Sequence, residues 1–175
     1  MSYPDAKDFI YYAGRLDLGE ISKDIAEALG VPAGAIRLQH GVPGAQGFGN
    51  RHVEAYDNRM KQLRGRGYTS FAAFAFAVAS KFQRICEGGG GRLLLVRDED
   101  GYDHCLVIQH DADSGFWVIV TGLIKRVERS PDLFTVMRTG GSEPTPSAVG
   151  SGRRSRFETL RLPPKATKGA DDSRS

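Results

Sequence analysis

The hydrophobic pattern follows a helical period in the first half of the chain and a strand period in the second half. Residues 4–20 predict a short helix followed by a turn. Residues 21–30 predict a second short helix, because Ser22 is a favoured N-cap residue and Gly30 a favoured helix stop. A turn and a short strand around residues 36–39 come next.

Two longer helices are predicted at residues 50–66 and 70–87. Apolar side chains recur at spacings of three and four in both, which indicates one buried face on each helix. They are Val53, Tyr56, Met60 and Leu63 in the first helix, and Phe71, Phe74, Val78, Phe82 and Ile85 in the second. The remaining surface of the first helix is basic, which by itself indicates only a solvated face.

The sequence EGGGG at residues 87–91 is a strong break, and the pattern after it alternates as in strands. Three strands are predicted, within residues 92–101, 102–115 and 116–125, and the sequences DEDG and DADSG between them are typical of hairpin turns. Residues 131–138 predict either a helical turn or a further strand. Helices that precede a strand meander predict an α+β domain, with N-terminal helices packed on a C-terminal antiparallel β-sheet.

Residues 1–162 are expected to form a single domain, because 175 residues are enough for one full hydrophobic core and few for two. Within this domain, residues 139–153 are rich in Gly, Ser and Pro and predict a flexible loop. Residues 155–162 alternate polar and apolar positions and predict a last strand. Residues 163–175 predict a disordered tail.

Charge and targeting signals restrict the class of partner and the location of the protein only slightly. The formal net charge of +3 is a mild preference for an anionic partner. No apolar run approaches the ~20 residues of a membrane-spanning helix, and the N-terminus lacks a signal-peptide pattern. We therefore expect a cytoplasmic location, or delivery into the cytoplasm of a target cell.

Several familiar chemistries have no motif in this chain. There is no GxxxxGK[ST] phosphate loop, no HExxH zinc motif and no GxSxG nucleophile elbow. Cys86 and Cys105 lack the close Cys/His spacing of a zinc site, and we expect buried thiols in a helix and a strand, respectively. We expect no metal site and no cofactor.

The four histidines are the candidates for proton transfer. His104 and His110 lie at opposite ends of one predicted strand, where a solvated or edge position is expected. His40 ends the first short strand and is a weaker candidate for lining a site. His52 lies in the first turn of a predicted helix, where the helix N-terminus favours the neutral form that a general base needs. On spacing alone, His52 can be either a catalytic group or an ordinary histidine at a helix border.

Short motifs follow one another in a distinctive order between residues 18 and 125. A short helix ending in Leu-Gly leads to a strand containing Ile, in ISKDIAEALGVPAGAIRLQHG. A G-x-x-H-[IV] helix start follows in GFGNRHVEAY, then a Phe-rich helix, then a meander whose third strand, FWVIVTG, carries Trp and ends in Thr. In this order the chain resembles prophage and polymorphic-toxin nucleases of the barnase/EndoU/colicin-type/RelE-like (BECR) ribonuclease superfamily.

The resemblance implies a metal-independent endoribonuclease that cleaves tRNA or another cellular RNA. In that reaction the RNA 2′-hydroxyl attacks the adjacent phosphorus and leaves a 2′,3′-cyclic phosphate and a 5′-hydroxyl end. The resemblance also implies that His52 is the acid/base group and that Thr121 hydrogen-bonds a phosphate oxygen. The last strand of such folds often supplies another polar or basic group, which points to Ser155 and Arg156.

Three arginines are candidates for contact with RNA phosphates, namely Arg51, Arg59 and Arg92. The chain departs from its relatives where they often have a second basic residue four or five places after the helix histidine, because Tyr56 and Asp57 stand there. Either Tyr56 shares the proton transfer, or His40 or a basic residue of the sheet supplies the second group, or this member is degenerate.

Two other functions stay open. One is a non-catalytic RNA- or protein-binding phage accessory module. The other is a toxin of the ADP-ribosyltransferase type, since residues 155–162 contain the right residue types, although without a Glu-x-Glu motif. A toxin nuclease implies a cognate immunity protein or antitoxin, acidic where it covers the basic helix.

Overall fold

The computed structural model describes residues 5–126 and 134–135, in which two short strands and four helices precede a run of five strands. These residues lie within one unit, Met1–Thr139. The strands are β1 (Gly19–Ile21), β2 (Gly34–Arg37), β3 (Arg84–Gly89), β4 (Arg92–Glu99), β5 (Tyr102–Asp111), β6 (Phe116–Arg126) and β7 (Phe134–Thr135). The helices are α1 (Lys23–Leu29), α2 (Gly49–Glu54), α3 (Asp57–Arg64) and α4 (Phe71–Ala79). The α+β class predicted from the sequence is confirmed.

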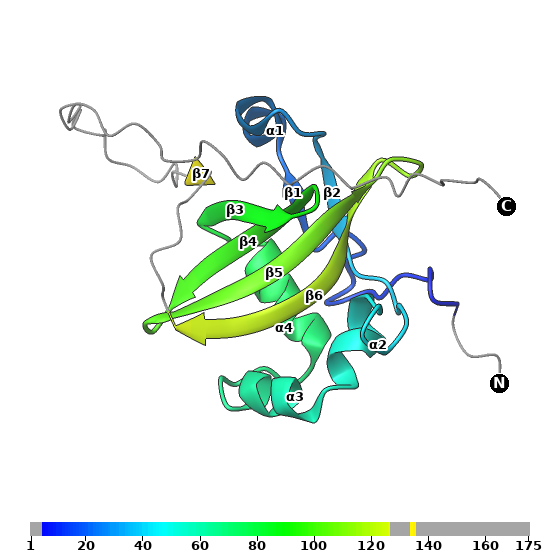
Figure 1. Cartoon of the computed structure of the whole chain (residues 1–175), viewed down its shortest axis with the longest axis vertical. Helices are drawn as coiled ribbons and strands as arrows, with labels where there is room; N and C mark the ends of the chain where they lie inside the picture. Colours follow the sequence, from blue (N-terminus) through cyan, green and yellow to red (C-terminus); the bar gives the residue numbers. More distant parts are fainter. Residues whose placement is uncertain (1–4, 127–133, 136–175) are drawn as a thin grey trace, which may run out of the picture. The chain divides into compact units, whose positions relative to one another are not determined.

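The described strands form one sheet in the order β1-β2-β6-β5-β4-β3-β7 (Figure 1). The predicted meander of β4, β5 and β6 is confirmed, and its first turn has positive φ angles at Asp100 and Gly101, as a tight hairpin requires. The C-terminal strands β3–β7 pair antiparallel as predicted, but the N-terminal strand β2 joins the same sheet in parallel with β6, which was not predicted. This pairing joins segments about 80 residues apart, which no local pattern predicts.

Helix α4 lies against one face of the sheet and supplies much of the core (Figure 1). Phe71 and Phe74 are fully buried there. Gly122 of β6 leaves the space that their rings fill, since a Cβ at this position would lie 2.7 Å from Phe71 Cε2 and 2.8 Å from Phe74 Cε1. The glycine therefore permits close packing of the helix on the strand.

The single helix predicted at residues 50–66 is wrong, because the chain forms two helices with a break at Tyr56. This residue has extended backbone angles, φ −103° and ψ 99°, and is the N-cap of α3. Met60 and Leu63 are buried as predicted, but Tyr56 is 38% exposed and does not belong to the buried face. The spacing from Val53 to Met60 suits a continuous helix, so the apolar pattern does not reveal the break.

The helix predicted at residues 70–87 ends at Ala79, and β3 begins within the same segment at Arg84. Ile85 is buried, but as a strand residue opposite Leu95 of β4. Cys86 is buried as expected, in a strand instead of a helix. The glycines at 88–91 connect β3 to β4 in a hairpin, so they do not mark a change from helix to strand.

The N-terminal segment contains no helix among residues 5–18, in contrast to the prediction. Phe9 instead forms an isolated antiparallel bridge with Gln39. The helix predicted at residues 21–30 is confirmed as α1. The Ser22 hydroxyl accepts a hydrogen bond from Ile25 N, and Gly30 closes the helix in the left-handed conformation.

For residues 131–138 the sequence predicted either a helical turn or a further strand. Within this segment, Phe134–Thr135 forms β7 beside β3. The predicted loop at 139–153, the strand at 155–162 and the tail at 163–175 lie outside the described residues. Among the helices that the structure describes, none has the length and apolar character needed to cross a membrane.

Candidate functional site

Along one edge, strand β6 pairs with a neighbouring strand over only part of its length. β2 pairs with it only at Trp117 and Val118, and the chain then leaves the sheet and enters α2. Helices α2 and α3 contact β6 instead. The pairing of β5 with β6 shifts by one residue here, because Val107 faces Thr121 while Ile108 faces Ile119, which leaves Val120 as a β-bulge. This edge is where helix side chains meet the sheet.

A closed loop between β2 and α2 prepares the helix start. Val42 and Phe48 exchange two backbone hydrogen bonds of 3.1 Å, which closes the loop at its base. Gly49 has φ +75°, and a Cβ there would lie 2.6 Å from the carbonyl oxygen of Gln39. The glycine therefore permits the chain to turn tightly against its own incoming segment. The result is that the tip of the loop, at Gly44, lies beside the first turn of α2.

His52 is held by this loop. It is 8% exposed, and its Nδ1 lies 2.9 Å from the carbonyl oxygen of Gly44. A carbonyl oxygen only accepts hydrogen bonds, so Nδ1 carries the hydrogen and donates it. The neutral ring then has its lone pair on Nε2, which forms no hydrogen bond with the described residues. The Gly44 contact thus selects the tautomer of a general base.

Three further side chains follow His52 in a chain of contacts. The rings of His52 and Tyr56 meet edge to face with centroids 5.2 Å apart. The guanidinium carbon of Arg59 lies 5.2 Å from the centroid of the Tyr56 ring. Arg59 Nη1 donates a hydrogen bond of 2.5 Å to Thr121 Oγ1 on β6. We call these four residues the His52–Thr121 cluster.

The cluster combines groups that can act on a phosphodiester. An imidazole with a free lone pair can accept a proton, and a phenol can donate one. A guanidinium has five N–H donors, and Thr121 takes up one of them, so Arg59 retains donors for an anion. The structure therefore brings together four residues that the sequence singled out one by one.

The other predicted residues lie elsewhere. Arg51 donates a 3.5 Å hydrogen bond to the Gly41 carbonyl, so it supports the loop before α2. His40 accepts a backbone hydrogen bond from Arg51, and its half-buried side chain forms no ring contact or hydrogen bond with the cluster. Arg92 is exposed on β4 and donates to Gln109. Ser155 and Arg156 are outside the described residues.

The expectation of a solvated or edge position for His104 is wrong, because this residue is 1% exposed. Its Nδ1 lies 2.8 Å from the hydroxyl oxygen of Tyr68, and its ring packs beside Phe74. Burial lowers the pKa of His104, against the opposing effect of the Glu99 carboxylate. His110 is half-buried with its ring against Trp117. Of the four histidines, His104 has a structural role in the core.

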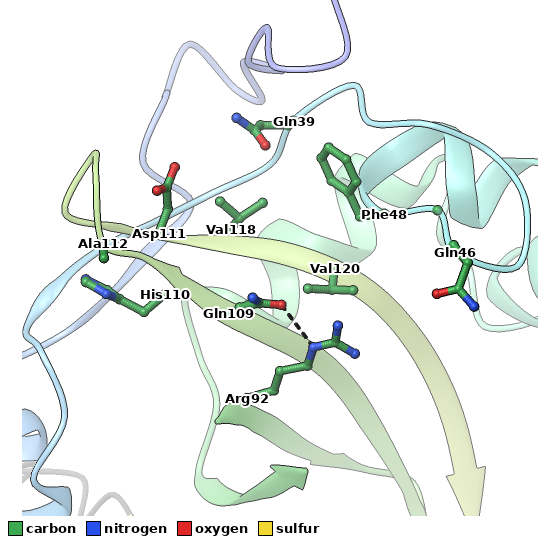
Figure 2. Close-up of a pocket in the computed structure, with 11 residues that line it drawn as sticks. Gln39, Gln46, Phe48, Arg92, Gln109, His110, Asp111, Ala112, Val118 and Val120 are labelled. Carbon is green, nitrogen blue, oxygen red and sulfur yellow. Dashed lines mark hydrogen bonds between the residues drawn. The ribbon is translucent and has the colours of Figure 1, made fainter. Parts of the chain in front are cut away.

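A cavity of about 360 Å³ lies between the loop before α2 and strands β5 and β6 (Figure 2). Its polar side chains include Gln39, Gln46 and Gln109, and its apolar ones include Phe48, Val118 and Val120. The glutamines and Phe48 occupy no defined position of a sequence motif and were not among the predicted site residues. The pairing register of β5 with β6 places Gln109 opposite Val118, but no local sequence pattern indicates that the loop before α2 closes over them.

A basic surface lies at the end of α3, where Lys61, Arg64 and Arg66 are exposed. The guanidinium carbon of Arg66 is 3.6 Å from the ring centroid of Tyr102. Hydrogen bonding to Arg126 and Arg66 lowers the pKa of the Tyr102 hydroxyl, which reflects the local positive charge. This surface favours an anionic partner.

Within residues 5–126 and 134–135, no group of three or more His, Cys, Asp or Glu side chains is placed to hold a metal ion. Comparison of the chain with protein-family models, with curated proteins and with solved structures found no match.

Proposed function

We propose that this protein is a metal-independent endoribonuclease of the toxin type, which cleaves tRNA or another cellular RNA by attack of the 2′-hydroxyl. The observation that carries the proposal is the His52–Thr121 cluster. It joins a histidine with a free ring nitrogen to a guanidinium and two hydroxyl groups at the edge of β6.

In the proposed reaction, His52 Nε2 takes the proton from the 2′-hydroxyl as O2′ bonds to phosphorus. The imidazolium that forms keeps its Nδ1–H on the Gly44 carbonyl, which holds the ring in place. Arg59 and Thr121 stabilise the negative charge that builds on the phosphoryl oxygens. The products are a 2′,3′-cyclic phosphate and, after cleavage of the P–O5′ bond, a 5′-hydroxyl.

The second proton-transfer group is the part of the mechanism for which the family motif offers no histidine. We assign it to Tyr56, whose phenol donates a proton to the leaving O5′ and regains one from His52 or solvent. The assignment rests on its edge contact with the His52 ring and on its partial exposure. His40 is a weaker choice because its side chain does not contact the cluster.

The exposed cations at and just after the end of α3 suit the binding of a long anion and of an acidic protein inhibitor. We propose that Lys61, Arg64 and Arg66 contact RNA outside the cleavage site and that binding weakens as salt concentration rises. We propose that an immunity protein or antitoxin with an acidic surface covers the same cations.

A single 2′-deoxy substitution tests this chemistry. An RNA oligonucleotide that the protein cleaves in EDTA is compared with one that lacks only the 2′-hydroxyl at the cleaved position. The proposal expects cleavage of the first and none of the second, since the nucleophile is missing. Equal cleavage of both would contradict the proposal.

The same incubation distinguishes the alternatives. Intact RNA together with salt-sensitive binding would favour a non-catalytic RNA-binding module. Modification of a protein target that requires NAD would favour an ADP-ribosyltransferase.

A further inference from the structure

The cavity between the loop before α2 and the β5–β6 face has the shape and chemistry of a small binding site. It measures about 360 Å³, within the lower part of the range for small-molecule pockets. We infer that it binds one nucleobase of the RNA substrate, which rests on the proposed function and specifies its substrate recognition. We call it the base pocket and define it by Gln39, Gln46, Phe48, Gln109, Val118 and Val120.

The walls of the base pocket suit a flat aromatic ligand. Figure 2 shows Phe48 on the loop side and Val118 and Val120 on the strand side. The phenyl ring is half-buried and offers a stacking surface, while the two valines offer an apolar floor. Stacking on an aromatic side chain is a general way for proteins to hold an unpaired base.

The glutamines offer both hydrogen-bond donors and hydrogen-bond acceptors. Gln39 is buried and uses its Nε2 to donate to the Lys7 carbonyl, so its Oε1 remains as an acceptor. Gln109 uses its Oε1 to accept from Arg92, so its amide hydrogens remain as donors. Gln46 is exposed at the mouth and keeps both functions. Hydrogen-bond donors and acceptors beside an aromatic ring are what base discrimination requires.

The base pocket adjoins the His52–Thr121 cluster through shared segments. Val120 lines the pocket, and the next residue, Thr121, is bonded to Arg59. Phe48 lines the pocket and immediately precedes α2, which carries His52. A base held in the pocket therefore brings its ribose and phosphate toward the groups proposed to cleave the chain.

Binding of nucleotides that cannot be cleaved tests the inference without relying on catalysis. The wild-type chain is titrated with the four nucleoside 3′-monophosphates, with ribose 5-phosphate and with inorganic phosphate. We expect at least one nucleotide to bind roughly 10-fold more tightly than ribose 5-phosphate, as stacking of one base supplies.

Two variants locate the binding. Gln46→Ala and Phe48→Leu are expected to reduce the affinity for that nucleotide toward the affinity for ribose 5-phosphate. Gln62→Ala, which removes an exposed glutamine of α3 outside the pocket, is the control and should leave the affinity unchanged. Because Gln46 is exposed, its variant remains informative even if Phe48→Leu disturbs the loop.

The outcomes distinguish failure of the base pocket from failure of the proposed nuclease activity. No nucleotide binding, affinities equal to that of ribose 5-phosphate, or affinities unaffected by Gln46→Ala would overturn the base pocket. If the protein gave one of these results and still cleaved RNA, the base pocket would be rejected and the proposed nuclease activity would not. Base-dependent binding without cleavage would keep the pocket and reject the nuclease.

Discussion

What distinguishes His52 from the other histidines is the partner of its Nδ1. A backbone carbonyl holds that nitrogen at 2.9 Å, whereas His104 has the hydroxyl of Tyr68 at 2.8 Å inside the core. The first partner can only accept, so it determines the tautomer, while a hydroxyl can donate or accept. The family resemblance and the helix position singled out His52, but the Gly44 carbonyl depends on the loop conformation and could not be predicted.

Arg59 is the cation of the His52–Thr121 cluster. Arg59→Ala removes the guanidinium next to Thr121, and we expect kcat for RNA cleavage to fall ~10²–10³-fold, as for loss of one preorganised donor to a developing oxyanion. Lys61→Ala removes an exposed cation from the same helix and is the matched control. We expect it to alter mainly the salt dependence of binding. Equal losses of kcat in both variants would show that general positive charge is sufficient.

Tyr56 is tested by removing a single oxygen. Tyr56→Phe retains the ring that contacts His52 and Arg59 but lacks the phenol proton. If the phenol is the general acid, kcat falls ~10²-fold or more and the alkaline limb of the pH–rate profile changes. Substrates with a good leaving group, which need no protonation, should be cleaved almost as fast as by wild type. A variant with unchanged kcat on RNA would reject the assignment.

Among the elements, the loop before α2 matters most for the site, because it positions both His52 and Phe48. Gly49→Ala introduces a Cβ 2.6 Å from the Gln39 carbonyl at a residue with φ +75°. We expect a loss of stability of at least ~1–3 kcal/mol, together with lower activity. Gly14→Ala is the control, since it has a similar φ of +73° but nothing within 4 Å of the added carbon. Unfolding in denaturant gives the stability difference, and similar activity losses in both variants would argue against a role for the loop.

The elements that the sequence predicted well are those determined by short-range signals. Ser22 and Gly30 mark the ends of α1, and tight turns join β4, β5 and β6. The errors have a common cause in tertiary context. Ile85 fits the helical period of α4, yet α4 ends at Ala79 and pairing with Leu95 of β4 makes Ile85 a strand residue. Tyr56 fits the period of α3 as well, but the chain breaks there and exposes its ring.

The candidate site was predictable in its residues but not in its assembly. Tyr56, Arg59 and Thr121 were each named from a motif or a charge pattern. Their contact requires α3 to lie against the edge of β6, and this edge exists only because β2 pairs with two residues of β6. The base pocket was not predictable, since three glutamines from separate segments carry no motif.

The burial of His104 predicts how the free energy of unfolding of the protein depends on pH. Burial lowers its pKa in the folded state, so the unfolded chain binds more protons just below pH 6.5, the ordinary pKa of histidine. The free energy of unfolding should therefore decrease as the pH falls below that value. Denaturant unfolding of wild type and His104→Gln at a series of pH values tests this.

The His104→Gln curve should decrease less over the same range, because glutamine does not titrate. Burial raises the pKa of Asp103, which acts in the opposite direction at lower pH, but both proteins contain this group and its effect cancels in the comparison. Parallel curves for the two proteins would contradict the assignment to His104.

Chemical rescue of His52→Ala tests most directly whether the protein is a ribonuclease that uses His52 for proton transfer. Wild type and variant are incubated with total RNA in EDTA, with and without added imidazole, and the fragment ends are mapped. We expect cyclic-phosphate ends from wild type, none from the folded variant, and partial recovery when imidazole replaces the missing ring. Undiminished cleavage by His52→Ala, or intact RNA with the folded wild type, would contradict this expectation.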